Sequence, residues 1–82
     1  MRVRIELETM SDVNNFCAAA AKVEPDVYLV DRIHRFKVNA KSQLACMLAS
    51  AQWGEIYCEC DEDIYSSIEP WVARNSNVSE HE

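Results

Sequence analysis

Between residues 2 and 8, apolar side chains stand at every second position and charged side chains stand between them. Successive side chains of a strand point to opposite faces, so this pattern predicts a strand with one buried face and one wet face. The buried face is expected to hold Val3, Ile5 and Leu7.

From Ser11 the apolar positions change to helical spacing and continue to Val23. Ser11 is the predicted N-cap, because a serine hydroxyl accepts hydrogen bonds from first-turn N–H groups, and Asp12 suits the positive helix end. Pro25 is expected to stop the helix. The apolar side chains that recur along it are Val13, Phe16, Cys17 and Ala20.

Two further strands are predicted over residues 26–31 and 33–38, joined by a tight connection near Asp31 and Arg32. A second helix is predicted over residues 42–50, with Ser42 at its N-cap.

A fourth strand is predicted over residues 52–60, with Ile56, Cys58 and Cys60 facing inward. Gly54, the one glycine of the chain, is expected to mark a bulge or a close approach of two backbones in this strand.

A third helix is expected to open at the acidic residues 61–63, where carboxylates complement the helix N-terminus. Pro70 lies within its apolar stripe and should produce a kink or an early stop. The stripe consists of Ile64, Tyr65, Ile68, Trp71 and Val72.

The predicted order of elements, βαββαβα, favours an α+β fold in which three helices pack on one side of a single antiparallel sheet. Residues 1–74 are expected to form one domain, followed by a flexible polar tail over residues 75–82. The predicted core includes Val3, Ile5, Phe16, Leu29, Ile56, Ile64 and Ile68.

The net charge of −6 opposes a general role on nucleic acids or anionic membranes. No stretch reaches the roughly 18 apolar residues that span a bilayer, and the first residues lack the apolar core of a signal peptide, so a cytoplasmic protein is expected. Four of the eight basic residues fall within ten positions, which predicts either a solvated sheet edge or a docking patch for an acidic partner. They are Arg32, Arg35, Lys37 and Lys41.

The four cysteines lack the Cys-x-x-Cys spacing of a metal or redox site, and the two histidines are far apart in sequence. Reduced thiols within the core are therefore predicted, with neither a metal nor a cofactor.

Residues 38–42, Val-Asn-Ala-Lys-Ser, followed by the helical pattern Leu44, Met47 and Leu48, resemble the second-helix region of HPr. HPr is the small phosphocarrier protein of the bacterial sugar phosphotransferase system. The resemblance is specific over residues 38–47 and extends by pattern over residues 2–72. It implies an open-faced sandwich with strand order 1-4-2-3.

In many members of that family the serine that matches Ser42 is a regulatory phosphorylation site. The resemblance also makes Lys41, Gln43, Leu44 and Met47 candidate partner-binding residues, although the family usually has an apolar residue where Gln43 stands. The alternatives are that Ser42 is only a helix cap and that Leu44 and Met47 belong to the core.

The phosphoacceptor histidine of the family is missing. The family carries Gly-x-His-Ala-Arg-Pro after the first strand, whereas Thr9 occupies the place of the histidine here. The resemblance therefore implies a regulatory or binding protein rather than an enzyme or histidine phosphocarrier. Its expected partners are proteins, such as phosphotransferase-system components or transcriptional regulators. Two alternatives stay open: a phosphocarrier-type protein that uses Thr9 or Ser11, and a pure protein-interaction domain.

Overall fold

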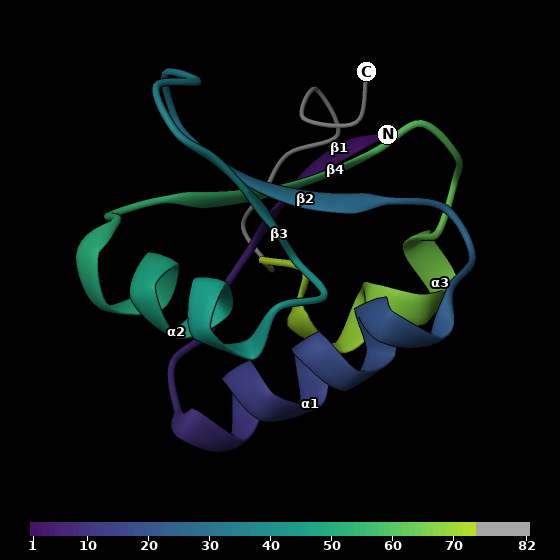
Figure 1. Ribbon diagram of the computed structural model, residues 1–82, viewed down its shortest axis with the longest axis horizontal. Coiled ribbons are helices and arrows are strands. Elements are labelled where there is room, and N and C mark those ends of the chain that lie inside the picture. Colours follow the sequence, from purple (N-terminus) through teal and green to yellow (C-terminus); the bar gives the residue numbers. More distant parts are fainter. Residues whose placement is uncertain (74–82) are drawn as a thin grey trace.

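The computed structural model describes residues 1–73. One antiparallel sheet with strand order β1-β4-β2-β3 is covered on one side by three α-helices, which confirms the predicted α+β architecture and strand order (Figure 1). The predicted tail at residues 75–82 lies outside the described residues. The elements are β1 (Arg2–Ile5), α1 (Met10–Lys22), β2 (Val27–Asp31), β3 (Lys37–Asn39), α2 (Gln43–Gln52), β4 (Ile56–Cys60), α3 (Tyr65–Ile68) and the 3-10 turn η1 (Glu69–Trp71).

Strand β4 is central, because it pairs with β1 on one side and with β2 on the other. The outer edge of β1 is occupied by the segment after η1: Ile5 forms a bridge with Val72, and the backbone N–H of Ala73 donates to the carbonyl of Arg4 at 2.9 Å. The three-residue strand β3 forms the other edge of the sheet.

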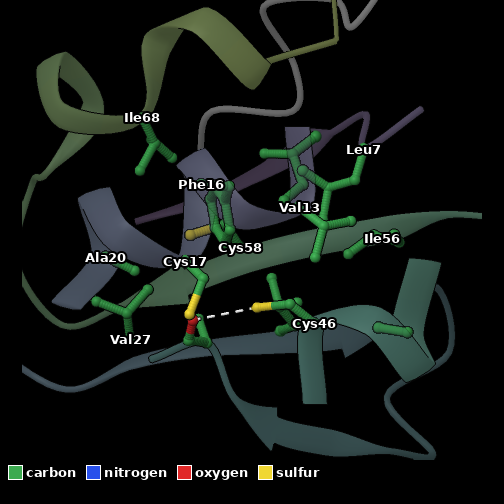
Figure 2. Packing of buried hydrophobic residues seen from close by; sticks show 14 of the residues in the cluster. Leu7, Val13, Phe16, Cys17, Ala20, Val27, Cys46, Ile56, Cys58 and Ile68 are labelled. Atoms are coloured by element: carbon green, nitrogen blue, oxygen red, sulfur yellow. Dashed lines mark hydrogen bonds between the residues drawn. The ribbon is translucent and has the colours of Figure 1, made fainter. Parts of the chain in front are cut away.

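The core lies between the sheet and the helices. Every predicted core residue is buried, and the most exposed of them is Ile64 at 7%. The helix α1 faces the sheet through Phe16 and Ala20, both fully buried (Figure 2). The ring of Phe16 also meets Trp71 edge to face, with centroids 5.7 Å apart. All four cysteines are buried and free, as predicted.

The start of α1 differs from the prediction. Thr9, and not Ser11, is the N-cap: its hydroxyl accepts from the N–H of Asp12 at 3.0 Å. The Asp12 carboxylate accepts from the N–H of Thr9 at 3.1 Å, which completes a capping box. Ser11 is the second residue of the helix, and its hydroxyl instead accepts from the side-chain amide of Asn15.

The second hairpin also differs. The strand predicted over residues 33–38 begins only at Lys37, because residues 32–35 form the turn. The Asp31 carboxylate closes this turn by accepting from the N–H of Phe36 at 2.9 Å. His34 takes a positive φ of 60°, a backbone conformation that sequence patterns rarely reveal outside glycine.

The end of β1 and the start of β4 also differ from the prediction. The ladder of β1 ends at Ile5, short of the predicted residue 8, because its partner strand begins at Ile56. Helix α2 continues to Gln52, so the segment predicted as the start of β4 is partly helical. Gly54 lies outside β4, so it does not form the predicted bulge in that strand. A Cβ added at Gly54 would meet no atom within 4 Å beyond its chain neighbours, so the predicted close approach is also wrong.

The end of the third helix follows the prediction. Helix α3 stops at Ile68, and Pro70 lies in the 3-10 turn that follows it. The acidic stretch before α3 contributes through Asp63, whose carboxylate accepts from the N–H of Tyr65 at 3.0 Å.

Candidate functional site

The start of α2 is built by a turn of the backbone and a helix cap. The N–H of Ser42 donates to the Asn39 carbonyl at 3.1 Å, and the Asn39 side chain accepts from the N–H of Lys41 at 2.9 Å. The Ser42 hydroxyl then accepts from the N–H of Ala45 at 3.2 Å. The predicted N-cap is therefore confirmed, and the Ser42 side chain is only partly buried.

The first turn of α2 contains no acidic residue. This distinguishes it from α1, whose first turn contains Asp12, with a carboxylate that accepts from the N–H of the cap residue Thr9. The positive end of the α2 dipole thus has no carboxylate of its own in that turn, and it favours added negative charge.

Lys41 does not support Ser42 directly. Its ammonium nitrogen lies 2.8 Å from the carbonyl oxygen of Val23 and 3.5 Å from that of Glu24, at the end of α1. A cation is favoured there because a helix C-terminus presents unpaired carbonyls. Lys41 is therefore partly buried as a link between two helices rather than displayed as a partner-binding cation.

The remaining candidate residues divide between surface and core. The Gln43 side chain is exposed and donates its amide to the side-chain oxygen of Asn14 on α1. Leu44 is 65% exposed, as a partner-facing residue should be. Met47 is partly buried and packs against the core, which agrees with the alternative interpretation for this residue.

Leu48 is a surface residue that the sequence interpretation had not assigned to a partner-facing role. It is 49% exposed, four positions after Leu44. Residues separated by four positions lie on the same helix face, so the two leucines form one apolar strip that begins just after Ser42. The spacing was visible in the sequence, but the side of α2 that faces water was not.

Thr9, which the resemblance to HPr would align with the family's phosphoacceptor histidine, does not have the surroundings of an active nucleophile. Its hydroxyl is held as the acceptor of the capping box, and the Asp12 carboxylate also accepts from the N–H of Glu8 at 3.0 Å. An anion at this helix end would meet the negative charge of the Asp12 carboxylate.

Two thiols lie beneath the site. The Cys17 thiol donates to the Lys41 carbonyl at 3.3 Å. The Cys46 thiol donates to the Ala40 carbonyl at 3.2 Å, which is the dashed line in Figure 2. Burial raises the pKa of Cys46 to about 12, with smaller contributions from the charge and the hydrogen bond of Cys17. A thiol with such a pKa stays neutral at physiological pH, so Cys46 contributes packing and a hydrogen bond rather than a nucleophile.

Within residues 1–73, no three His, Cys, Asp or Glu side chains are gathered closely enough to hold a metal ion. None of the helices in the described part of the chain has the length and apolar character that crossing a bilayer requires. Comparisons with protein-family models, with curated proteins and with solved structures find no match to this chain. The chemistry of the α2 start therefore has to be judged from its own geometry.

Proposed function

We propose that this protein is a small HPr-like regulatory protein of a phosphotransferase system, which binds a partner protein through the start of α2 and carries no phosphohistidine. The α2 start is defined here as Ser42, Gln43, Leu44 and Leu48. The strand order and the single helical layer agree with the arrangement that the resemblance implies. They make the family a reasonable framework for the proposal.

The observation that carries the proposal is that Ser42 and Leu44 both lie in the first turn at the start of α2. A partly exposed hydroxyl, which a phosphate could modify, stands two positions before Leu44, an apolar side chain that is 65% exposed. A phosphate on Ser42 would add about two negative charges at the positive end of α2, where the first turn has no competing acid. The fold tolerates that charge. The α2 start, which offers an apolar surface without the phosphate, would then also carry negative charge.

The geometry at Thr9 favours this proposal over a phosphocarrier that uses Thr9 or Ser11. The Thr9 hydroxyl caps α1, and Asp12 brings a carboxylate to the place where a phosphoryl group would have to sit. The Ser11 hydroxyl is exposed but lies in the same first turn, next to the same carboxylate. Electrostatic repulsion therefore opposes transfer to either hydroxyl.

The test is a titration of the ¹⁵N-labelled protein with the purified general phosphotransferase enzyme and with purified transcriptional regulators of the same sugar system, followed by amide chemical shifts. We expect binding by at least one of them, with the largest shifts at residues 42–48. Leu44→Ser should weaken that binding about tenfold, whereas Ile33→Ser, an equally drastic change at an exposed residue outside α2, should leave it unchanged. Absence of binding by all of these proteins would contradict the proposal.

Ser42→Asp distinguishes a regulated protein from a pure interaction domain. In the proposed role it changes the affinity for the partner by at least about fivefold, in either direction. An affinity unchanged by Ser42→Asp but lost with Leu44→Ser would favour the pure interaction domain.

A further inference from the structure

The turn of the β2–β3 hairpin and the end of α2 together form a surface that the proposed function does not use. We call it the hairpin surface and define it by Ile33, Arg35, Phe36 and Trp53. Ile33 is 58% exposed and Phe36 is 50% exposed, although both are large apolar side chains. Phe36 stacks on Trp53 with centroids 6.2 Å apart and ring planes inclined by 17°.

A hollow of about 390 Å³ opens between these elements, lined by Ile33, Phe36 and Trp53 together with Arg32, Arg35 and Glu55. The volume suits one large side chain of a bound segment. Tryptophan and arginine are the residues that dominate the energy of protein interfaces, because each offers a large rigid surface and a directed polar group. The composition of the hollow therefore resembles the centre of an interface more than an ordinary exposed loop.

The hairpin holds this surface in one conformation before any partner arrives. The carbonyl of Asp31 accepts from the N–H of His34 at 3.1 Å, and the Asp31 carboxylate accepts from that of Phe36. The ring nitrogen Nε2 of His34 lies 2.5 Å from the carboxylate of Glu59 on β4, which ties the turn back to the sheet. A surface ordered in this way loses little conformational entropy on binding.

The charge of the surface indicates what it binds. Residues 32–37 carry two arginines and a lysine with no acid, in a chain whose net charge is −6. The guanidinium of Arg35 is 69% exposed, lies 5.3 Å from the centre of the Phe36 ring and has only a distant ion pair, 3.9 Å from Asp31. Asp31 and Glu55 also line the hollow, but the Asp31 side chain is only 12% exposed and Glu55 is partly buried, so the two exposed arginines supply most of the charge that faces solvent.

We propose that the hairpin surface binds an acidic segment of a partner protein, which places an aromatic or aliphatic side chain in the hollow and flanking carboxylates near Arg32 and Arg35. Carboxylates complement the two guanidinium groups, and arginine recognises them in a planar, bidentate geometry. A nucleic acid would also offer negative charge, but it carries a phosphate at every nucleotide, so the net charge of −6 repels it more strongly than a short segment with a few carboxylates. The inference does not depend on Ser42 or on the α2 start.

The first experiment selects ligands from random 12-residue peptides displayed on phage, with the whole protein as bait and the Phe36→Ser variant for counter-selection. We expect the enriched peptides to contain an aromatic or leucine residue flanked by Asp and Glu. Enriched peptides without an excess of acids, or peptides that bind both proteins equally, would overturn the proposal. The fold of the variant is checked by circular dichroism and thermal unfolding.

The second experiment measures the affinity of the most enriched peptide and maps its site by amide and tryptophan indole shifts. Arg32→Glu should weaken the peptide at least tenfold without disturbing the core, because this side chain is exposed and has no ion pair within residues 1–73. Leu44→Ser is the control and should have no effect. A peptide that depends on Leu44 rather than Arg32 would overturn this inference and leave the proposed function intact.

The same binding and chemical-shift measurements would reveal two other kinds of ligand at the hairpin surface. Tighter binding of a single-stranded oligonucleotide than of the acidic peptide would replace the proposal with a nucleic-acid site. Shifts at the hairpin that grow with protein concentration, together with a dimer in analytical ultracentrifugation, would show that a second copy of the chain occupies the surface. Either result overturns binding of an acidic partner segment.

Discussion

The ammonium nitrogen of Lys41 lies 2.8 Å from the carbonyl oxygen of Val23, so the residue before Ser42 satisfies the end of the neighbouring helix. One side chain thereby links the two helix termini, because Lys41 precedes α2 and bonds a carbonyl at the end of α1. The ammonium group of Lys41 is therefore engaged at the end of α1 rather than directed toward the Ser42 hydroxyl.

Removing this link should destabilise the fold. Lys41→Gln loses a charge-assisted hydrogen bond and a favourable helix-dipole interaction at a partly buried site, so the free energy of unfolding should fall by about 1–2 kcal/mol. Arg32→Gln is the control, because an exposed turn residue should change the stability by less than about 0.5 kcal/mol. Urea unfolding of both variants measures this, and equal stabilities would contradict the role of Lys41.

Substitutions of Ser42 should separate its cap from its charge. Ser42→Ala removes the acceptor for the N–H of Ala45 and should cost about 0.5–2 kcal/mol. Ser42→Asp should keep most of the stability, because aspartate caps as well as serine and adds a charge that the helix end favours. Thermal or urea unfolding beside the parent protein decides the order. A Ser42→Asp variant clearly less stable than Ser42→Ala would remove the physical basis for a regulatory phosphate.

Phosphotransfer to the start of α1 should be absent. After incubation with phosphoenolpyruvate and the general phosphotransferase enzyme of the sugar system, we expect the intact mass under neutral conditions to be unchanged, because Thr9 is a helix cap beside the Asp12 carboxylate. An HPr protein that carries the histidine serves as the positive control. An acid-labile phosphoryl mass would refute the expectation, and an acid-stable one located at Thr9 or Ser11 would support the phosphocarrier alternative.

The buried thiol of Cys58 should weaken the fold at alkaline pH. Burial, and then the neighbouring thiols of Cys60 and Cys46, raise its pKa from 9.0 to about 12. Above pH 9 the folded protein therefore keeps a proton that the unfolded chain releases. The contribution of the neutral thiol to the free energy of unfolding is complete below pH 9 and is lost as pH rises toward 12. In this range the free energy of unfolding should fall by up to about 1 kcal/mol per pH unit because of Cys58.

Urea unfolding between pH 7 and pH 11 measures this effect, with Cys58→Ala as the matched comparison. The variant starts from a lower stability because it leaves a small cavity, but its stability should fall less steeply above pH 9. Parallel curves for the two proteins would show that Cys58 is not responsible. Lysines and tyrosines titrate in the same range, so only the difference between the curves is interpreted.

The parts of the structure that the sequence predicted are those encoded by local patterns. The change of period after Val38, with a serine at the change, was sufficient to place Ser42 at the N-cap of α2. Alternation and helical spacing likewise identified buried residues such as Ile5 and Phe16. These signals depend only on neighbours within a few positions, which is why they could be interpreted without a structure.

The errors arose where the partner is distant in sequence or where two local signals compete. Thr9 and Ser11 are both good capping residues, and only the reciprocal bond with Asp12 decides between them. Phe36 belongs to the strand predicted over residues 33–38, yet it is 50% exposed and its ring stacks on Trp53, the C-cap residue of α2. No local pattern contains such a partnership, and the target of Lys41, 18 positions away, was hidden for the same reason.

The central place of β4 constrains how the chain acquires its structure. Strands β1 and β2 never pair with each other, and both rely on residues 56–60 to complete their hydrogen bonds. During synthesis β1 therefore stays unpaired until more than two thirds of the described residues have emerged. A chain interrupted after α2 contains the β2–β3 hairpin but lacks the strand that connects this hairpin to β1. Contacts between residues so far apart in sequence slow folding, because loop closure precedes any gain from pairing. A ribosome-bound series of increasing length should consequently show protection from proteolysis in one late step, after β4, rather than gradually.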